Sequence, residues 1–454
     1  MITATISARS VQLSQRLDAH YFLAPGALAA ERLLLLKAAG VPTVRIGGTG
    51  GVGGVQPTSR TKRVYAGWGE TGVPYLRPYD TFDYLPQPAD TIALETADGL
   101  VNDPGVILQT CSGRNLGPST YCDAYLAGFA ISDDMLRLAI PDPTMRMYVL
   151  AFLLTGAGQS LLRRSKTGGV IDHLSVADLE SVEVPLLVDD IDSIASLMQS
   201  AVDNRERGRM RLAAAISALD SAQPEPARLH RLRAGWTVPW SRVGNRIDAA
   251  YYDPNVSAIV DALRGTDAAA CGDLADMFIP GRYKRYYVEP SHGRPILSGR
   301  QLLQHRPIGL RHISTRSVDF DEFSLHEGCV AFGAEGRAEE RIAFPCLIAA
   351  DRDGWLANNH VMRAVPHTGV SGGQLFLGLA CSQALSQVKA LACGSVVDAV
   401  YAEDMRRVVV PLASPELALQ ATDAWRLLAQ SCQDEAAAIA ALDCCIQNQL
   451  QGVA

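Results

Sequence analysis

An internal duplication constrains this chain more than any other feature of its sequence. Four tracts recur in the same order in its two halves, which chance rarely produces. They are AAAISALD at 213–220 and AAAIAALD at 436–443, RLDAHYF at 16–22 and RIDAAYY at 246–252, RTKRVY at 60–65 and RYKRYY at 282–287, and the tracts that begin at Thr167 and Cys393. We therefore predict that one module has been duplicated, and that each copy ends in a long helix.

The two long helices are predicted from apolar residues spaced alternately by four and three. Such a seam buries its apolar side chains against a partner helix. In the central stretch the seam is interrupted at Arg205 and Gly208, and its apolar members are Ile194, Met198, Ala201, Leu212, Ala215 and Leu219. In the C-terminal stretch it is interrupted at Glu435, and its members are Leu417, Ala421, Ala424, Leu428, Cys432, Ile439, Leu442 and Ile446. We expect the two helices to pair with each other.

Composition and strand patterns predict a globular α+β domain in each half. The chain has 454 residues, of which 48% are hydrophobic and 20% are charged, so each half can bury a core. Short alternating apolar runs separated by turn residues indicate strands. The predicted boundaries are 1–186 for the first domain, 187–223 for the central helix, 224–411 for the second domain and 412–454 for the C-terminal helix.

Three local segments carry more specific expectations. Leu28 to Gly40 has the pattern of an amphipathic helix closed by a glycine, and Met145 to Leu162 has the pattern of another. Gly47 to Val55 is glycine-rich but lacks the Lys-Ser/Thr of a nucleotide-binding loop. We interpret it as a flexible loop that leads to a basic strand and could approach a DNA backbone closely.

No motif for catalysis, metal binding or membrane insertion stands out. The chain has neither a long apolar stretch nor an apolar leader, so we expect a cytoplasmic protein with no membrane partner. Its ten cysteines and nine histidines lack metal-ligand spacing, and the Asn/Asp-Pro-Pro-aromatic turn that a DNA methyltransferase needs does not occur. No cofactor is therefore expected. An enzyme with an unrecognised site stays open, and a metal or cofactor bound to the purified chain would reveal it.

Basic residues gather inside each predicted domain although the net charge of the chain is −7. A local basic face on an acidic protein suits phosphate contacts on one side and protein partners on the other. Solvated surface charge is the plainer interpretation, and the polar residues that follow the strand in GVILQTCSGRNLG could serve only their turn. The candidate DNA contacts are Arg60, Lys62, Arg63, Arg77, Thr110, Ser112, Arg114 and Asn115 in the first copy, and Arg282, Lys284, Arg285, Arg300 and Arg337 in the second.

Together these motifs resemble the specificity (S) subunit of type I restriction-modification enzymes. The resemblance rests on the opening R-[LI]-D-A-x-Y-[FY] pattern, the GVPYL tract at Gly72 to Leu76, the element from Gly158 to Leu174, the Val-Pro-Leu strand and the long helix. This order occurs twice and covers nearly the whole chain. The second copy departs in places, with GRPIL instead of GVPYL and Asp398-Ala399 instead of Asp172-His173.

The resemblance implies two target-recognition domains separated by an antiparallel pair of long coiled-coil helices. Each domain would read one half of a bipartite double-stranded DNA site, and the helices would dock DNA methyltransferase (M) subunits, expected to be two. A restriction (R) subunit is a further partner, and the chain itself would be a non-catalytic part of a phage-defence complex. The alternative is a duplicated protein-interaction scaffold without base readout. Salt-dependent binding to duplex DNA separates the two, because phosphate contacts release counterions.

Overall fold

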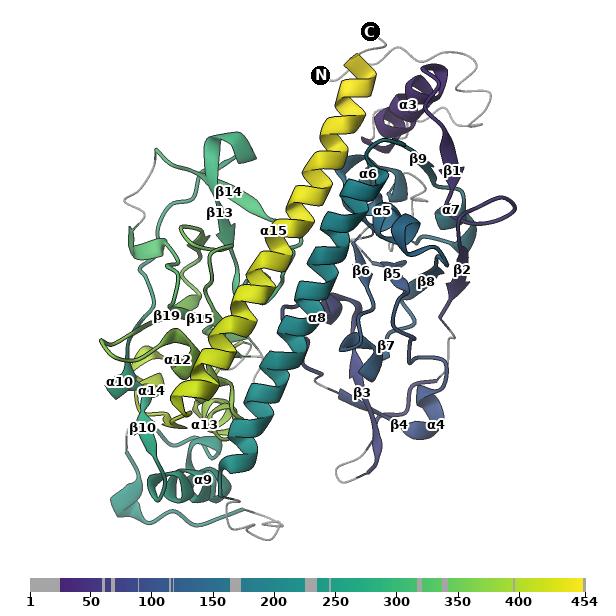
Figure 1. Cartoon of the computed structure of the whole chain (residues 1–454). Coiled ribbons are helices and arrows are strands. Elements are labelled where there is room, and N and C mark those ends of the chain that lie inside the picture. The colour runs from purple at the N-terminus through teal and green to yellow at the C-terminus, as the bar shows by residue number, and fades with distance from the viewer. Residues whose placement is uncertain are drawn as a thin grey trace. The chain divides into compact units, whose positions relative to one another are not determined.

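The chain folds into two compact units of mixed helix and sheet (Figure 1). The computed structural model describes residues 25–58, 62–66, 70–88, 90–113, 116, 118–163, 173–224, 235–244, 246–316, 321–336, 342–394 and 397–451. Unit 1 comprises Met1–Phe82, Pro86–Glu206 and Ser431–Ala454, and unit 2 comprises Asp83–Leu85 and Arg207–Gln430. The predicted mixture of helix and sheet is confirmed, whereas the duplication stays a prediction.

The described residues of unit 1 form two sheets and a strand pair. The four-stranded sheet has the order β2-β8-β5-β6, the three-stranded sheet has the order β4-β3-β7, and β1 pairs with β9. The strands are β1 (Thr43–Arg45), β2 (Gly54–Pro57), β3 (Gly72–Leu76), β4 (Asp90–Ala93), β5 (Ile107–Thr110), β6 (Ser119–Tyr121), β7 (Ala130–Ile131), β8 (Met135–Ala139) and β9 (Glu183–Pro185). The helices are α3 (Pro25–Ala38), η1 (Pro78–Phe82), α4 (Leu94–Ala97), η2 (Leu126–Gly128), α5 (Pro143–Leu154), α6 (Gly156–Leu162) and α7 (Val176–Glu180).

Unit 2, over the residues that the structure describes, has two four-stranded sheets and two strand pairs. The sheets have the orders β11-β19-β15-β17 and β12-β14-β13-β18, and the pairs are β10 with β21 and β16 with β20. The strands are β10 (Ala268–Ala270), β11 (Ala275–Phe278), β12 (Tyr287–Val288), β13 (Gly293–Leu297), β14 (Arg311–Ser314), β15 (Val330–Gly333), β16 (Glu335–Gly336), β17 (Cys346–Leu347), β18 (Leu356–Ala357), β19 (Val361–Pro366), β20 (Asp398–Ala399) and β21 (Val409–Pro411). The helices are η3 (Trp240–Arg242), η4 (Ala250–Tyr252), α9 (Pro254–Arg264), α10 (Cys271–Leu274), η5 (Pro290–His292), α11 (Gly299–Leu302), η6 (Asp321–Phe323), α12 (Gly372–Ala380), α13 (Ser382–Leu391) and α14 (Ala402–Met405).

Two long helices, α8 (Ile191–Ala222) and α15 (Pro415–Gln451), lie side by side (Figure 1). In unit 1, Nη2 of Arg205 lies 2.5 Å from Oε2 of Glu435, and both side chains are less than a tenth exposed. The amide of Asn204 donates to Asp434 at 3.0 Å. The charged Glu435 was expected to interrupt the buried face of α15. It instead belongs to that face, because it neutralises the buried Arg205.

In unit 2 the same helices approach closely at Gly208. A Cβ at this position would lie 2.8 Å from Cγ of Leu428 and 3.0 Å from the carbonyl oxygen of Ala424. Real Cβ atoms rarely come so close to their neighbours, so a side chain here would push the two helices apart. At Gly208, the second interruption of the central seam, α8 and α15 therefore pack closely.

Near Glu435, the buried positions of α15 lie one residue earlier in the sequence than predicted. Ser431 and Ala438 are fully buried, whereas the predicted Cys432 and Ile439 are only half-buried. The sequence pattern treated Glu435 as a break and placed the buried positions one residue later here, although Ile439 still packs against the core of unit 1. A helix that includes Glu435 in its buried face places the neighbouring buried residues three or four positions away from it.

The segment predicted as one helix from Met145 to Leu162 is two helices, α5 and α6, bent by 80°. Thr155 ends the first, and its hydroxyl caps the second by accepting a hydrogen bond from Gly158 N at 3.0 Å. All residues of α5 from Met147 to Leu154 are buried in the core of unit 1. No single described helix has the length and apolar character needed to cross a membrane, and this bent pair meets that test by length and composition alone.

Glycines end the first helix and shape the segment after it. Gly40 follows α3 with φ of +87°, as predicted for a helix C-terminus. Gly48 also has a positive φ, and a Cβ at Gly53 would lie 2.5 Å from the carbonyl oxygen of Ala139. The end of the glycine-rich stretch is therefore packed against β8, whereas Gly48 to Gly50 are exposed, and the flexibility of this loop stays a prediction.

Tyr84 is the centre of a buried polar network in unit 2. Its hydroxyl contacts the carboxylate of Asp351 and accepts a hydrogen bond from Nε of Arg352 at 2.9 Å. Its ring packs edge-on against Trp425, with centroids 5.1 Å apart. The side chains of Asp351 and Arg352 are both less than a tenth exposed, so this pair of opposite charges is shielded from solvent.

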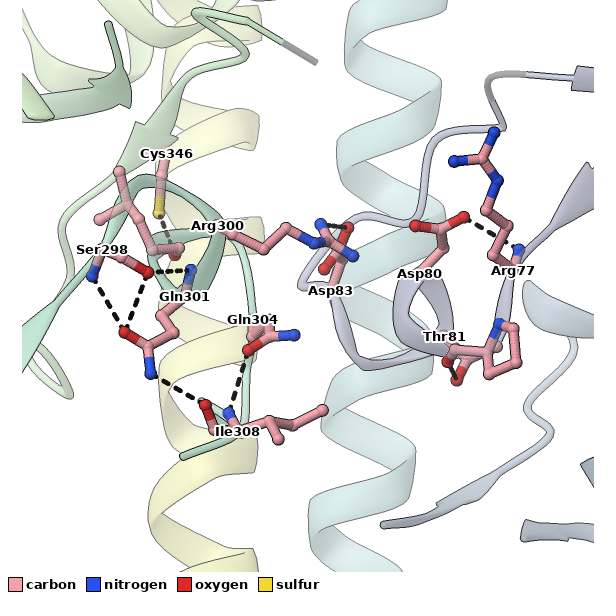
Figure 2. Close-up of polar contacts among 12 residues, drawn as sticks. Arg77, Asp80, Thr81, Asp83, Ser298, Arg300, Gln301, Gln304, Ile308 and Cys346 are labelled. Carbon is pink, nitrogen blue, oxygen red and sulfur yellow. Dashed lines mark hydrogen bonds and ion pairs between the residues drawn. The ribbon is translucent and has the colours of Figure 1, made fainter. Parts of the chain in front are cut away.

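Asp83 and its neighbours are held by two arginines of the same unit. The fully buried Arg209 donates to the carbonyl oxygens of Asp83 and Tyr84 at 2.8 and 3.1 Å. Figure 2 shows Arg300 extending toward the carboxylate of Asp83, which lies 2.9 Å from its Nη1. Asp83–Leu85 is therefore an integral part of unit 2, although its sequence neighbours on both sides belong to unit 1.

Candidate nucleic-acid interface

Unit 1 places polar side chains together where β5 ends and β8 begins. Arg63 approaches Oδ1 of Asp133 at 2.8 Å and donates to the hydroxyl of Tyr75 at 3.1 Å. Next to Asp133, Asp134 accepts a hydrogen bond from the hydroxyl of Ser112, two residues after the end of β5. We call Arg63, Tyr75, Ser112, Asp133 and Asp134 the Asp133 cluster.

The Asp133 cluster contains a permanent cation. Burial alone would lower the pKa of Arg63, but the neighbouring Tyr75 and Asp133 raise it above its ordinary value. Burial also raises the pKa of the Tyr75 hydroxyl, against the opposing effects of Ser132 and Arg63. At neutral pH the arginine is therefore charged and the tyrosine is protonated, so Arg63 has an ion pair with Asp133 and a neutral acceptor in Tyr75.

Unit 2 has a similar group of side chains where β15 ends and β19 begins. Arg285 donates to the side-chain oxygen of Asn359, and its guanidinium lies 5.4 Å from the ring centroid of Tyr283. Nδ1 of His360 lies 2.7 Å from Oε1 of Glu335, an approach that is an ion pair when the ring is protonated and that lies outside hydrogen-bond geometry. We call Tyr283, Arg285, Glu335, Asn359 and His360 the Asn359 cluster.

Main-chain hydrogen bonds hold the two clusters in the same way. In each unit, two adjacent polar residues precede the strand β8 or β19: Asp133 and Asp134 in unit 1, and Asn359 and His360 in unit 2. The carbonyl oxygen of the second of them accepts a hydrogen bond from the residue that follows β5 or β15. The residue before the two donates to the last residue of β3 or β13. These bonds are Cys111 N to Asp134 O at 3.0 Å and Ser132 N to Leu76 O at 3.1 Å in unit 1, and Ala334 N to His360 O at 2.8 Å and Asn358 N to Leu297 O at 2.9 Å in unit 2.

A row of alternating cations and aromatic rings extends from the Asn359 cluster along β12 and β14. Lys284 lies 5.0 Å from the ring centroid of Tyr286, and Arg311 lies 4.4 Å from that of Tyr287. Both rings are nearly half exposed. A cation beside an exposed ring is well placed to meet a phosphate while the ring contacts a sugar or a base. In unit 1, Tyr65 is exposed and Val64 stands where the second copy has Tyr286.

The other predicted contact residues have different surroundings. Thr110 is buried and its hydroxyl donates to Pro118 O, so it stabilises the turn after β5. Arg77 lies 3.1 Å from Asp90, and Arg300 lies near Asp83 as described above. Both of these arginines are exposed, as are Lys62, Arg282 and Lys284. Arg60, Arg114, Asn115 and Arg337 lie outside the described residues.

Sequence reasoning missed several members of both clusters. Asp133, Asp134, Asn359 and His360 were not selected because acidic and neutral residues do not stand out in a search for basic DNA contacts. A signal was nevertheless present, since SDDMLRLA and NNHVMRAV align as repeats and differ at these polar positions. The aromatic residues of the RYKRYY tract were also passed over in favour of its charges.

A further cavity in unit 2 lies around Arg246, in the repeated RIDAAYY tract. It encloses about 790 Å³ and is lined in part by Asp248, Tyr251, Tyr401 and Asp404. Arg246 approaches Asp248 at 2.8 Å and Asp404 at 3.3 Å. Two tracts that repeat in the sequence therefore meet through this arginine. Within the described part of the chain, no three His, Cys, Asp or Glu side chains are grouped so that they could hold a metal ion.

Comparisons with known proteins give structural likenesses only. No protein-family model matches the chain, and no curated protein matches it. The S subunit of the type I restriction-modification system of M. genitalium is similar over 91% of this chain and 95% of its own, with 11% identity and a TM-score of 0.30. A structure of a type I R-M system assembly matches at 14% identity, covering 91% and 98%, with a TM-score of 0.29. The HsdS subunit of Thermoanaerobacter tengcongensis matches at 15% identity, covering 91% and 95%, with a TM-score of 0.25. These TM-scores are too low for the likeness to indicate a function for this chain.

Proposed function

We propose that this chain is the sequence-specific DNA-recognition subunit of a type I-like restriction-modification or related methylation-based defence complex. In this proposal each of the two domains reads one half of a bipartite site in double-stranded DNA. Methyl transfer belongs to partner subunits, two of which dock on the long helices, and the chain itself carries no catalytic site. The domains are 1–186 and 224–411, and the helices are 187–223 and 412–454.

The observation that carries the proposal is the exposed row of cations and rings in unit 2. Lys284 with Tyr286 and Arg311 with Tyr287 present positive charge and aromatic surface side by side. Phosphates supply most of the affinity of a DNA-binding protein, and rings and polar groups beside them can contact bases. A net charge of −7 on the whole chain makes such a local basic row more informative than it would be on a basic protein.

The corresponding main-chain hydrogen bonds support the proposal that the chain has two DNA-recognition domains with the same backbone arrangement. The sheet orders β2-β8-β5-β6 and β11-β19-β15-β17 follow the same sequence of repeated tracts. Two domains that bind half-sites of different sequence need the same backbone arrangement but different polar side chains at the strand ends. This supports our proposal that the halves are copies of one module.

The long helices support the proposed spacing role. At about 1.5 Å per residue, a helix of 32 residues such as α8 extends roughly 48 Å, more than one turn of duplex DNA at roughly 34 Å. We propose that this pair sets the distance between the two half-sites. The buried pair of Arg205 and Glu435 would fix the register of the helices and therefore that distance.

The experiment is the salt dependence of duplex binding by the full chain. We expect the logarithm of the binding constant to fall linearly with the logarithm of the salt concentration. Lys284→Ala and Arg311→Ala should each reduce the slope by about one. Lys389→Ala is the matched control, because it removes an exposed cation from α13, away from the row. A chain that binds duplex DNA without a salt-dependent slope, or not at all, would instead support a protein-interaction scaffold.

A further inference from the structure

Four positions in the two clusters correspond through the repeated tracts. Arg285 stands in RYKRYY where Arg63 stands in RTKRVY, and Glu335 stands after β15 where Ser112 stands after β5. Asn359 and His360 in NNHVMRAV stand where Asp133 and Asp134 stand in SDDMLRLA. The side-chain contacts correspond as well, because Arg63 contacts Asp133 and Arg285 contacts Asn359, while Ser112 contacts Asp134 and Glu335 lies beside His360.

The chemistry of the corresponding contacts differs. In unit 1 the arginine is paired with a carboxylate, and the second contact joins a hydroxyl to another carboxylate. In unit 2 the arginine meets a neutral amide, and the second contact joins a carboxylate to an imidazole. Carboxylates only accept hydrogen bonds, whereas an amide both donates and accepts. The charge of Arg63 is therefore compensated by its contact Asp133, and Asn359 provides no such compensation for Arg285.

The cluster side chains can be reached from solvent. The side chains of Arg63, Glu335 and His360 are 36%, 46% and 38% exposed, and that of Asp133 is 14% exposed. In unit 2 the exposed residues Lys284, Tyr286 and Tyr287 lie next to Arg285 in the sequence, one before it and two after it. A ligand bound along this row would therefore lie near Arg285.

Resting on the proposed function, we propose that these corresponding pairs determine which bases each unit prefers. In unit 1, the carboxylates of Asp133 and Asp134 favour a base whose major-groove edge presents an amino group, which is adenine or cytosine. In unit 2, no carboxylate among the described residues forms an ion pair with Arg285, whose contacts are Asn359 and Tyr283. Arg285 therefore favours guanine, because such a guanidinium can donate two parallel hydrogen bonds to O6 and N7. The two units thus read different half-sites from one backbone arrangement.

The test is a binding-site selection with the full chain and two reciprocal variants. Asp133→Asn removes the compensating charge from Arg63, and we expect one position of one half-site to change toward guanine by about tenfold. Asn359→Asp should have the opposite effect in the other half-site only, where we expect the preference for guanine to fall by about tenfold. Glu95→Gln is the control, because it removes one exposed carboxylate from unit 1 outside the cluster and should leave both half-sites unchanged.

The outcomes separate this inference from the proposed function. If the wild-type chain selects a bipartite site and both variants select the same site, the clusters do not determine base preference and the inference is wrong. If a variant alters both half-sites equally, its effect is general and the inference is again wrong. If the wild-type chain selects no sequence and shows no salt-dependent binding, the proposed function itself fails. Because the two substitutions lie in different units, misfolding of one variant leaves the other as a valid test.

Discussion

The two units bury an arginine of the same helix in different ways. Arg205 and Arg209 are one turn apart on α8, and the first belongs to unit 1 and the second to unit 2. Arg205 is neutralised by the carboxylate of Glu435, whereas Arg209 donates to the carbonyl oxygens of Asp83 and Tyr84. The first arrangement joins two helices, and the second fixes a short segment of chain.

The candidate interfaces repeat this contrast. Corresponding main-chain hydrogen bonds hold the Asp133 and Asn359 clusters, yet the arginine of one is paired with a carboxylate and that of the other with an amide. Main-chain bonds do not depend on side-chain identity, so they can stay constant while the side chains change. The fold of each unit and the polar chemistry of its cluster can therefore vary separately.

Glu435→Ala should destabilise unit 1 most strongly. The substitution leaves Arg205 charged and buried without its carboxylate, and loss of one member of a buried ion pair costs about 3–5 kcal/mol. Hydrogen exchange of the full chain should show faster exchange in residues 431–451 than in residues 415–430 of the same helix. Asp423→Ala is the control, since it breaks an exposed pair with Arg426 on α15 and should cost at most about 1 kcal/mol. Equal effects of the two substitutions would contradict a special role for the buried pair.

Tyr84→Phe should have the next largest effect, and in unit 2. The variant keeps the ring that packs on Trp425 but removes the hydroxyl that contacts Asp351 and Arg352. We expect this loss to lower the free energy of unfolding by about 1–3 kcal/mol. Faster hydrogen exchange is expected around residues 346–366. Tyr401→Phe, which removes a hydroxyl from an exposed ring of the same unit, should change little. If hydrogen exchange instead becomes faster in β5 and β8 of unit 1, the assignment of Asp83–Leu85 to unit 2 would be wrong.

The sequence predicted those elements that depend on local pattern and on repetition. The end of α3 at Gly40, the strands that end in Val-Pro, and the buried residues of α8 follow from turn chemistry and apolar spacing. The break at Thr155 was missed because it depends on a threonine that caps one helix while ending another. Apolar spacing alone does not distinguish a long helix from two short ones with a sharp bend between them.

The candidate site was predicted only in part, for a physical reason. Basic residues such as Lys62 and Arg285 can be selected by charge, but whether an arginine is compensated depends on which residue lies opposite. That residue is distant in the sequence, as Asp133 is from Arg63. The sequence of Asp83–Leu85 likewise gives no sign that the segment belongs to unit 2, since its partners Arg209 and Arg352 follow more than a hundred positions later.

The smallest expected effect concerns a pH-dependent contact that unit 1 cannot have. His367 in unit 2 lies 3.1 Å from Asp273 O and 3.4 Å from the carboxylate of Asp276, and these acceptors raise its pKa above the ordinary 6.5. Pro141 follows the corresponding strand in unit 1. A raised pKa in the folded state means that the protonated ring stabilises unit 2 below the ordinary pKa, and that this contribution disappears as pH rises through the folded value.

Thermal unfolding of the wild-type chain and His367→Gln between about pH 6 and 8 measures this contribution. The wild-type chain should be slightly more stable than the variant at the lower pH, and the difference should vanish toward the higher pH. The exposed position of His367 keeps the effect small because solvent screens its charge. A difference that stays constant across this range would mean that the imidazole contributes through packing, and that the two units do not differ in their response to pH at this position.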